Sequence, residues 1–492
     1  MKKYLLALDQ GTTSSRAIIF DRNGKTVSIA QREFDQIYTD NGWVEHDPRD
    51  ILDSQIGVMK EALLKAEIDA NDIDCIGIAN QRETTIIWDK KTGKPVYNAI
   101  VWQCRRTADY CEKIEREYGN KIYKKTGLKV DAYFSASKIN WILSNVKGAR
   151  KRAEKGELLF GTVDTFLLWH LTKGKSYYTD YTNASRTMLF NIRDLKWDEE
   201  LLRIFDVPAK ILPEVKPSGY NFGVTDASFL GTEIPVCALV GDQQSALFGQ
   251  TCWKEGECKT TYGTGCFLLM NTGDKRINSK HGLLTTLGAS TGKPPFALEG
   301  SVFVGGAAVK WLKEGLGLIK EAKDSEAVAK SVKDTDGVYV VPAFVGLGAP
   351  YWDSNARGII TGITRATTSA HIVRATLESI AYQVYDVVKA MECDSGKKIR
   401  GLRVDGGASV NGFLTQFQAD VLGVSVIKPE SIESTASGAV YLAGLTSGFY
   451  KDASEIIANK TGDTEYKPEM KRKERIEKIT GWKTAVRKTL GD

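Results

Sequence analysis

The sequence predicts an α/β protein with more than one domain. Short apolar runs typical of strands alternate with helical periodicity at the start of the chain, and this alternation returns in its middle and last parts. Two turns that carry glycine and threonine, near residues 11 and 263, each lie between two such strands. A chain of 492 residues is also long for one hydrophobic core, so two or three domains are expected.

The first predicted elements are strands joined by polar turns. These strands are Tyr4–Leu8, Arg16–Phe20, Val27–Ala30, Ile73–Ala79 and Thr84–Trp88. The turn Gly11–Ser15 joins the first two, and Asn23-Gly24 is a strong hairpin signal before the third. Residues Ile51–Ala66 have the apolar spacing of a helix.

The later elements repeat this arrangement. Strands are predicted over Ile234–Val240, Cys258–Tyr262, Cys266–Asn271, Gly337–Val341, Gly358–Ile363 and Leu402–Val404. Helices are predicted over Gln243–Gly249, His371–Met391 and Phe413–Leu422. The repeated strand–turn–strand unit favours a duplicated architecture, with a domain boundary near residue 250.

Composition and charge argue against a nucleic-acid partner and a membrane span. The chain is 42% hydrophobic and 26% charged, and its net charge of +6 is small for its length. The basic runs Lys147–Lys155 and Lys467–Lys478 are interleaved with glutamate or glycine, which is typical of solvated helix faces. No stretch approaches the roughly 18 apolar residues that span a membrane. The apolar run before Asp9 is too short for a secretory signal.

The cysteines indicate a cytoplasmic location. There are eight of them without Cys-x-x-Cys spacing, and the four histidines are far apart, so a zinc site is not expected. The cysteines are therefore predicted to act mostly as small apolar residues in a reducing cytoplasm.

The segment Asp9–Ser15, which reads DQGTTSS, is richer in small hydroxyl side chains than a tight turn requires. Backbone N–H groups of a glycine-containing turn form an anion-binding concavity, and threonine and serine hydroxyls add donors. The carboxylate at its entrance suits a magnesium ion that bridges to a phosphate. The turn therefore indicates a phosphate site, and the alternative is a polar hairpin that Asp9 initiates.

Two further segments offer similar donors. Gly263-Thr264-Gly265 could hold a polyphosphate from a second side. Asp405-Gly406-Gly407-Ala408 precedes a predicted helix, where glycine permits close approach and the helix start supplies unpaired N–H groups. Each segment also fits an ordinary glycine-bearing loop. The sequence has no P-loop and no Gly-x-Gly-x-x-Gly after a strand, so neither of those nucleotide sites is expected.

Charged residues follow two of the predicted strands. Asp242 lies where a strand ends and a helix begins, where ligands gather in α/β folds, although it could also cap that helix. Arg82 and Glu83 lie between two strands, and together they could donate to and accept from the hydroxyls of a polyol. The alternative for this pair is an exposed turn with a surface ion pair.

Together, these segments resemble the FGGY carbohydrate kinases of the actin-like ATPase fold, and within them the bacterial glycerol kinases. The resemblance covers residues 4 to about 485. It is carried by ALDQGTTSSR (Ala7–Arg16), NQRETTIIWD (Asn80–Asp89), NAIVWQCRRT (Asn98–Thr107), TDYTNASRTMLFNI (Thr179–Ile192), GDQQSALFGQ (Gly241–Gln250), TYGTGCFLLMNTG (Thr261–Gly273) and LRVDGGAS (Leu402–Ser409). The Arg-Glu-Thr-Thr and Trp-Gln-Cys-Arg-Arg segments are more specific than the Gly-Thr turns, which chaperone ATPases and actin share.

The resemblance implies two actin-like, ribonuclease H-like domains with a nucleotide cleft between them. Residues 1–250 would supply the glycerol and phosphate contacts, and residues 251–492 the nucleotide contacts. ATP and magnesium would serve to convert glycerol to sn-glycerol 3-phosphate, the first step of glycerol use. Members of the family form dimers and tetramers, so a homo-oligomer is expected.

The matching positions also imply roles for individual residues. Asp242 is expected to be the general base, and Asp9 and Asp242 to hold magnesium. The expected phosphate and nucleotide contacts are Thr12, Thr13, Ser14, Arg16, Thr264, Gly306, Lys310, Gly407 and Asn411. The expected glycerol contacts are Arg82, Glu83, Trp102, Tyr133, Asp242, Gln243 and Phe267, of which Trp102 and Phe267 would pack on its carbons.

Three positions depart from the family's pattern. Lys310 falls where many members have a neutral amide. In enteric members an arginine before the Ile-Pro strand binds an inhibitory sugar bisphosphate, whereas this chain has Glu233 there. Some Gram-positive members carry a phosphorylatable histidine near the position of Ser228. Both forms of regulation are therefore expected to be absent.

Two other functions stay open on these residues. Another FGGY kinase would act on a pentulose or a hexonate, although a small site walled by Trp102, Tyr133 and Phe267 favours a three-carbon polyol. A nucleotide-gated assembly protein of the actin and chaperone type would explain the Gly-Thr turns but not the Asp242 segment.

Overall fold

The computed structural model describes residues 2–39, 42–353, 355–460 and 462–491. The chain divides into two compact units, and each is α/β as predicted. The first unit combines Met1–Thr251, Thr285–Phe296 and Ser434–Lys460. The second unit combines Cys252–Leu284, Ala297–Glu433 and Thr461–Asp492. The division of functions between residues 1–250 and 251–492 stays a prediction.

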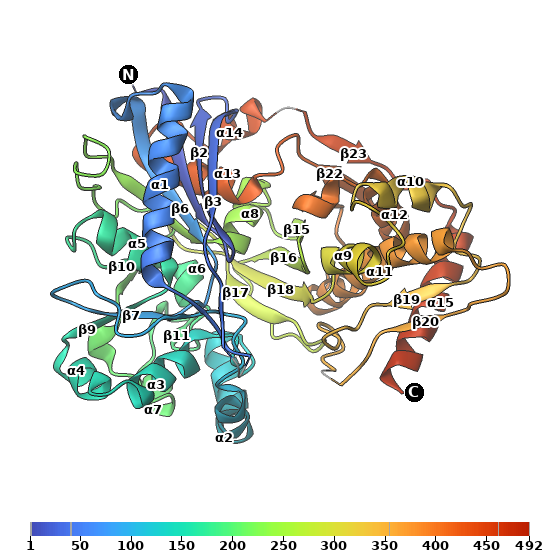
Figure 1. Cartoon of the computed structure of the whole chain (residues 1–492), viewed down its shortest axis with the longest axis horizontal. Coiled ribbons are helices and arrows are strands. Elements are labelled where there is room, and N and C mark those ends of the chain that lie inside the picture. Colours follow the sequence, from blue (N-terminus) through green and yellow to red (C-terminus); the bar gives the residue numbers. More distant parts are fainter. Residues whose placement is uncertain (1, 40–41, 354, 461, 492) are drawn as a thin grey trace. The chain divides into compact units, whose positions relative to one another are not determined.

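A mixed sheet forms the centre of the first unit (Figure 1). Within the described residues its strands follow the order β14-β6-β1-β2-β3. Their bounds are Val236–Gly241 (β14), Ile73–Asn80 (β6), Tyr4–Gln10 (β1), Ser14–Asp21 (β2) and Thr26–Glu33 (β3). Strands β14, β6 and β1 run parallel, whereas β1, β2 and β3 are joined as antiparallel hairpins.

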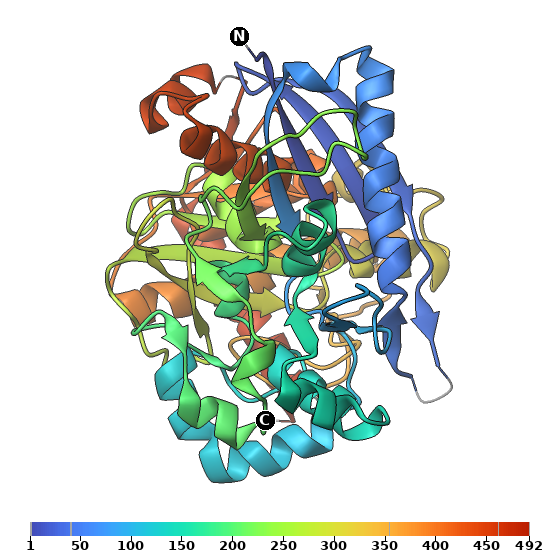
Figure 2. The same ribbon diagram turned by 90° about the vertical axis from the view of Figure 1, so that its left-hand side faces the viewer.

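Side chains of a strand alternate between the two faces of its sheet, so each face carries apolar side chains that must be covered. Helices cover both faces of this sheet. Leu6 of β1 belongs to a buried cluster that includes helix α1 (Pro48–Ala66), which Figure 2 shows lying along the strands. Helix α13 (Ser434–Ser447) packs on β6 and β14. A Cβ atom at Gly77 of β6 would lie only 2.3 Å from the Ala439 carbonyl oxygen of α13, so this close approach requires glycine.

Between β6 and β14 the chain adds small sheets and helices that carry several of the predicted site residues. The strands of this inserted region are β7 (Ile86–Asp89), β8 (Ala99–Ile100), β9 (Leu158–Gly161), β10 (Tyr178–Asp180), β11 (Phe190–Asn191), β12 (Lys196–Trp197) and β13 (Glu214–Lys216). Its helices are α2 (Ala108–Thr126), α3 (Ser135–Asn145), α4 (Ala149–Lys155), α5 (Val163–Leu171), α6 (Tyr181–Ala184) and α7 (Glu199–Ile204). The first unit also contains β4 (Ile37–Tyr38), β5 (Val44–His46), α8 (Asp242–Gly249) and α14 (Ala453–Asn459).

A second mixed sheet has the order β17-β18-β16-β15-β21-β22-β23 among the described residues. Its strands are Leu284–Leu287 (β17), Phe296–Val302 (β18), Cys266–Gly273 (β16), Cys258–Tyr262 (β15), Gly401–Asp405 (β21), Ser425–Lys428 (β22) and Thr464–Tyr466 (β23). In both sheets the first strand of a hairpin lies between its antiparallel partner and a parallel strand from later in the chain: β2-β1-β6 and β16-β15-β21. The duplicated architecture predicted from the two Gly-Thr turns is thereby confirmed.

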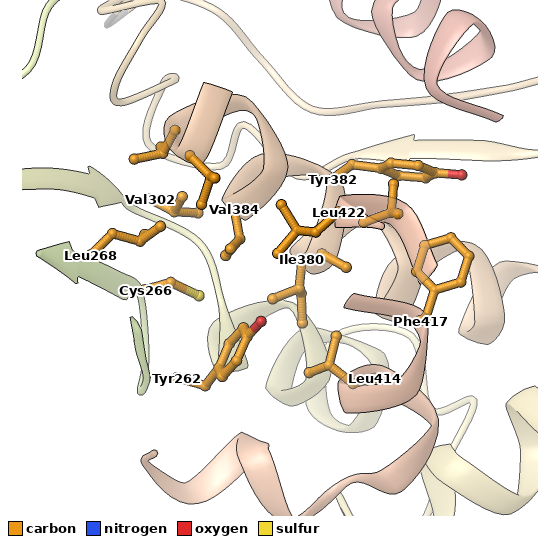
Figure 3. Close-up of a cluster of buried hydrophobic side chains, with 14 of the residues drawn as sticks. Tyr262, Cys266, Leu268, Val302, Ile380, Tyr382, Val384, Leu414, Phe417 and Leu422 are labelled. Carbon is orange, nitrogen blue, oxygen red and sulfur yellow. The ribbon is translucent and has the colours of Figure 1, made fainter. Parts of the chain in front are cut away.

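The second unit is held together by an apolar, aromatic core (Figure 3). Its helices are α9 (Gly306–Glu314), α10 (Asp324–Lys330), α11 (Ser369–Ser395), α12 (Gly412–Leu422) and α15 (Arg472–Leu490), and it also contains β19 (Tyr339–Val341) and β20 (Ile359–Thr361). Tyr382 of α11 stacks on Trp482 of α15 and meets Phe417 of α12 edge-on, with ring centroids 5.2 and 5.4 Å apart.

Some predicted elements have different ends in the structure. The strand predicted to begin at Thr84 begins at Ile86, because Thr84 closes a turn by donating its N–H to the Arg82 carbonyl at 2.7 Å. The strands predicted from residues 234, 337 and 358 begin at 236, 339 and 359. The helix predicted from residue 371 begins two residues earlier, at Ser369.

The basic runs and the cysteines agree with their predicted roles. Lysines of both runs, such as Lys151 in α4 and Lys473 in α15, are exposed on helices. The eight cysteines are free thiols, and only Cys393 among them is exposed. Within the part of the chain that the structure describes, no helix combines the length and the apolar character needed to cross a membrane.

Candidate active site

The parallel strands of the first unit bring two predicted site carboxylates to one edge of the sheet. Gln10 of β1 pairs with Asn80 of β6, which in turn pairs with Gly241 of β14. Asp9 directly precedes Gln10, and Asp242 directly follows Gly241. Because neighbouring strands lie about 5 Å apart, the backbones of β1 and β14 are about 10 Å apart at this level. The carboxyl ends of parallel strands are where ligands bind in α/β sheets.

The hairpin between β1 and β2 orders the first predicted phosphate turn. The Gly11 N–H donates to the Ser14 carbonyl at 3.0 Å and so closes the turn. Asp9 and Arg16 face each other across the hairpin, with Arg16 Nη2 2.6 Å from Asp9 Oδ2. The tip presents the hydroxyls of Thr12, Thr13 and Ser14. Because Asp9 is buried in strand β1 and pairs with Arg16, a role as simple turn initiator does not account for it.

The same turn is joined to two predicted glycerol residues. The indole N–H of Trp102 donates to Thr12 Oγ1 at 3.0 Å. Trp102 also meets Tyr133 edge-on, with ring centroids 5.5 Å apart. The structure therefore brings two of the three predicted aromatic walls together beside the phosphate turn.

Arg82 and Glu83 are buried, with 3% and 1% exposure. The expected alternative, an exposed turn with a surface ion pair, is therefore wrong. Arg82 Nε lies 3.4 Å from Asp242 Oδ1, and Arg82 Nη2 donates to the Tyr133 hydroxyl at 3.5 Å. Glu83 has a φ of 61°, a left-handed conformation that costs a non-glycine residue about 1–3 kcal/mol and that clusters at functional sites.

Asp242 is the first residue of helix α8, and Gly241 is its N-cap. Its side chain is 30% exposed, which distinguishes it from the buried Arg82 beside it. Asp242 Oδ1 accepts the Gln243 N–H at 2.7 Å, and Oδ2 accepts from Gln243 Nε2 at 3.2 Å. Capping, the alternative expected for Asp242, requires the N-cap position and is therefore wrong. A partly exposed carboxylate held by a guanidinium and an amide can accept a proton from a bound hydroxyl.

In the second unit, the hairpin between β15 and β16 joins the start of helix α9. The Gly263 N–H donates to the Gly265 carbonyl at 2.9 Å, which closes the turn around Thr264. The Gly305 N–H donates to the Thr264 carbonyl and the Gly306 N–H to the Gly263 carbonyl, both at 2.8 Å. The structure therefore brings Thr264 and Gly306, two predicted nucleotide contacts, together.

The third glycine segment lies at the end of β21, beside this hairpin. Asp405 pairs with Thr261 of β15, and a Cβ atom at the next residue, Gly406, would lie 2.6 Å from the Tyr262 carbonyl oxygen. Gly406 also has a φ of 84°, which favours glycine. Gly407 begins the single 3₁₀ turn Gly407–Val410 and faces open space.

The remaining predicted nucleotide residues have ordinary structural partners as well. Asn411 is the N-cap of α12, with its side-chain oxygen accepting the Leu414 N–H at 3.0 Å. Lys310 is 71% exposed on α9 and lies 3.6 Å from Glu314. Phe267 lies half-buried in β16, within the second unit, and its contact with glycerol stays a prediction.

Two buried cations of the first unit were not among the residues selected from the sequence. Arg186 is fully buried, and its Nε donates to Glu83 Oε1 at 2.6 Å. Lys138 is fully buried, and its ammonium donates to the Tyr133 carbonyl at 2.6 Å, while burial lowers its pKa to about 8. The sequence offers one signal for each of these buried cations: a single basic residue lies inside a run of small, hydroxyl and apolar side chains.

Comparisons with known families agree with this geometry. The model of the N-terminal domain of the FGGY family of carbohydrate kinases matches residues 4–249, and the model of its C-terminal domain matches residues 258–447. The chain belongs to the FGGY family of carbohydrate kinases. Both Gly-Thr hairpins and the Asp242 segment fall inside the matched ranges.

Individual FGGY relatives are similar over their whole length. The chain is 60% identical to a glycerol kinase of Fusobacterium nucleatum, covering 99% of each chain. It is 58% identical to glycerol kinase 1 of Clostridium tetani, covering 100% of this chain and 99% of the relative. The crystal structure of Plasmodium falciparum glycerol kinase with ADP has a TM-score of 0.93 at 38% identity, over 99% of this chain and 98% of that one. A xylulose kinase structure from Lactobacillus acidophilus, at 23% identity, covers 99% and 98% and has a TM-score of 0.88, which bears on the fold alone.

Proposed function

We propose that the protein transfers the γ-phosphoryl group of ATP to glycerol and releases sn-glycerol 3-phosphate and ADP. The observation that carries this proposal is the cluster in which buried Arg82 lies beside both Asp242 and the Tyr133 hydroxyl. Such a cluster offers one proton acceptor and fixed donors beside the Tyr133 and Trp102 rings. The relatives at 58–60% identity are named glycerol kinases, which supports glycerol as the acceptor.

The proposed roles in the first unit follow from the charges. Asp242 accepts the proton of the glycerol hydroxyl that attacks the γ-phosphorus, and Arg82 orients the Asp242 carboxylate. Glu83 accepts, and Gln243 and Tyr133 donate or accept, hydrogen bonds with the remaining hydroxyls. Because γ-phosphoryl transfer passes through a loose transition state, positioning and charge neutralisation contribute more than the base does.

The proposed nucleotide contacts come from both units, each with its own residues. In the first unit they are Thr12, Thr13, Ser14 and Arg16. In the second unit they are Thr264, Gly306, Lys310, Gly407 and Asn411. Backbone N–H groups and hydroxyls at such turns suit phosphate oxygens, because they donate without adding a bulky side chain.

Magnesium is the proposed metal, and the residues present fit it. Asp9 and Asp242 supply hard carboxylate oxygens at one edge of the sheet, and magnesium is commonly bound by one or two carboxylates together with phosphates and waters. Among the described residues, no group of three or more His, Cys, Asp or Glu side chains converges on one point. When bound, the ion neutralises charge on the phosphates.

The proposed function is tested by measuring ADP formation with and without glycerol. We expect strong stimulation by glycerol, little by xylulose or gluconate, and sn-glycerol 3-phosphate as the product in ³¹P NMR spectra. Stimulation by a sugar instead would assign a different acceptor to this FGGY kinase. Slow ATP hydrolysis that ignores every acceptor would contradict the kinase proposal and favour a nucleotide-gated assembly protein.

We also propose that the enzyme lacks bisphosphate inhibition. Glu233 is exposed in the loop before β14, where its carboxylate would repel an anionic effector. Ser228, near the expected phosphorylation position, is exposed and donates its N–H to Asp226 at 3.0 Å. Clear inhibition by fructose 1,6-bisphosphate would contradict the proposal. A cytoplasmic location and a homo-oligomeric state stay predictions.

A further inference from the structure

The stretch from Asp180 to Arg186, which includes helix α6, is a buried polar segment to which the proposed reaction gives no role. We call it the α6 segment. Asp180, Thr182, Asn183, Ser185 and Arg186 each have 0% exposure. Buried polar groups cost free energy unless they are hydrogen-bonded, so the partners of this segment indicate its purpose.

One set of contacts reaches the strand that carries Asp242. The Gly241 N–H donates to Thr182 Oγ1 at 2.8 Å, and that hydroxyl donates to the Asp180 carboxylate at 2.7 Å. The same Asp180 oxygen accepts from Ser218 Oγ at 2.7 Å. Because Gly241 is the N-cap of α8 and directly precedes Asp242, the Thr182 hydroxyl fixes the backbone from which the proposed base projects.

A second set of contacts reaches the loop that follows β6. The side-chain amides of Asn80 and Asn183 donate to each other, at 3.0 and 3.1 Å. Arg186 Nε donates to Glu83 Oε1 at 2.6 Å. The Arg186 guanidinium also lies over the Tyr133 ring, 5.5 Å from its centroid. This end of the segment therefore holds two of the proposed glycerol contacts.

We propose that the α6 segment is the positioning element that sets the proposed base and the glycerol contacts relative to each other. Thr182 acts on the Asp242 side and Arg186 on the Glu83 side, and neither is exposed to touch the substrate. The proposal rests on the proposed function. A displacement of about 1 Å at a reacting group can cost on the order of 100-fold in rate, so a rigid link between the two sides has a kinetic consequence.

The Thr182 contact is tested with two variants that separate the hydroxyl from packing. Thr182→Val keeps the shape and loses the hydroxyl, whereas Thr182→Ser keeps the hydroxyl and loses a methyl group. We expect kcat to fall at least about 10-fold in Thr182→Val and to be largely restored in Thr182→Ser, with the KM for ATP unchanged in both. Thr187→Val is the matched control, because Thr187 is equally buried and its hydroxyl bonds only within its own turn.

The Arg186 contact is tested by Arg186→Lys, which keeps the charge but not the aligned N–H donor. We expect the KM for glycerol to rise at least about 10-fold, because Glu83 loses its fixed orientation. Arg106→Lys is the matched control. Arg106 has a fully buried side chain, pairs with Glu45 at 2.6 Å and contacts none of the proposed glycerol residues directly. We expect Arg106→Lys to lower the unfolding midpoint without this rise in KM.

The outcomes separate failure of this proposal from failure of the proposed function. No glycerol-dependent ADP formation by the wild type would contradict the proposed function itself. A wild type that phosphorylates glycerol, together with a Thr182→Val enzyme at least as fast as Thr182→Ser, would overturn the positioning role. If Thr182→Val does not fold, an Arg186→Lys enzyme with the same glycerol KM as Arg106→Lys would overturn it instead.

Discussion

The two units differ in the burial of their candidate ligand contacts. The first unit buries arginines and acids beside its candidate site, among them Arg82, Glu83 and Arg186. The second unit buries an aromatic core around Tyr382, and it presents Thr264 and Lys310 at an exposed hairpin tip and helix face. The difference matches the proposed ligands. A small, uncharged polyol needs donors and acceptors fixed in place, whereas a polyanion can be held by backbone N–H groups and hydroxyls.

The two units should therefore respond differently to substitutions. Changes in the buried polar network of the first unit should alter catalysis and glycerol binding. Changes in the core of the second unit should alter stability while leaving the proposed glycerol contacts intact.

The largest expected effect comes from Asp242→Asn, which keeps the shape of the side chain and removes the proposed base. Because general-base help is typically worth about 10²–10⁴-fold, we expect kcat to fall by that amount. The KM for ATP should change less than kcat, since Asp9 and the two Gly-Thr turns keep their proposed contacts with the magnesium ion and the phosphates. Steady-state kinetics at saturating ATP measures both quantities. A kcat close to that of the wild type would remove Asp242 from its role.

The next effect concerns stability and pH in the first unit. Asp164 of α5 is fully buried, and burial, with a further contribution from the Asp180 carboxylate, raises its pKa to about 7. Between pH 4 and 7 the folded protein therefore keeps a proton that the unfolded chain releases. The contribution of Asp164 to the free energy of unfolding falls as pH rises through this range, by on the order of 4 kcal/mol, and is level above it.

Urea unfolding at pH 5 and pH 8 tests whether the free energy of unfolding falls as the pH rises. Asp164→Asn should show a smaller fall between the two pH values than the wild type, because an amide does not titrate. Asp109→Asn, at an exposed position of α2, is the control and should keep the fall. An Asp164→Asn protein with the pH dependence of the wild type would contradict the expectation.

A smaller effect is expected from Trp482→Phe in the core of the second unit. Trp482 is fully buried and donates its indole N–H to Asp386 at 2.6 Å. Burial raises the pKa of Asp386 to about 6, and loss of a donor to this acid should lower the free energy of unfolding by about 2–3 kcal/mol. The KM for glycerol should stay unchanged. A large rise in that KM would contradict the expectation that substitutions in the core of the second unit leave glycerol binding unchanged.

The smallest effect is expected from Lys310→Gln. Lys310 is mostly exposed, and its pairing with Glu314 one helical turn away is worth only a few tenths of a kcal/mol. We expect the KM for ATP to change less than about 3-fold, as measured by ADP formation at varied ATP. A rise of 10-fold or more would contradict this, because it would mean that Lys310 contributes more to nucleotide binding than an exposed contact does.

Local patterns in the sequence were sufficient to predict the main elements of both sheets. Apolar runs such as Tyr4–Leu8 and Cys258–Tyr262 have strand periodicity, and the turns between them carry glycine. The same patterns contain no signal that residues 285–296 and 434–460 belong to the first unit. The return of the chain to the first unit depends on long-range packing, such as the contact of Ala439 with Gly77. No short stretch of sequence reveals such a contact.

The candidate site was predictable only in part, for a similar reason. Asp9 and Asp242 each follow or end an apolar run, so their position at a sheet edge could be expected. The left-handed conformation of Glu83 could not, because no glycine marks it. Arg186 could not either, since its partner lies 103 residues away in the chain. Both features are held by the tertiary structure rather than by local sequence.

The central claim is that Asp242 accepts the proton of the attacking glycerol hydroxyl. A crystal structure with glycerol and a non-hydrolysable ATP analogue tests it most directly. We predict a distance of about 2.6–3.2 Å from an Asp242 carboxylate oxygen to one terminal hydroxyl. A hydroxyl in line with the γ-phosphorus that contacts another side chain, with Asp242 out of reach, would contradict the claim.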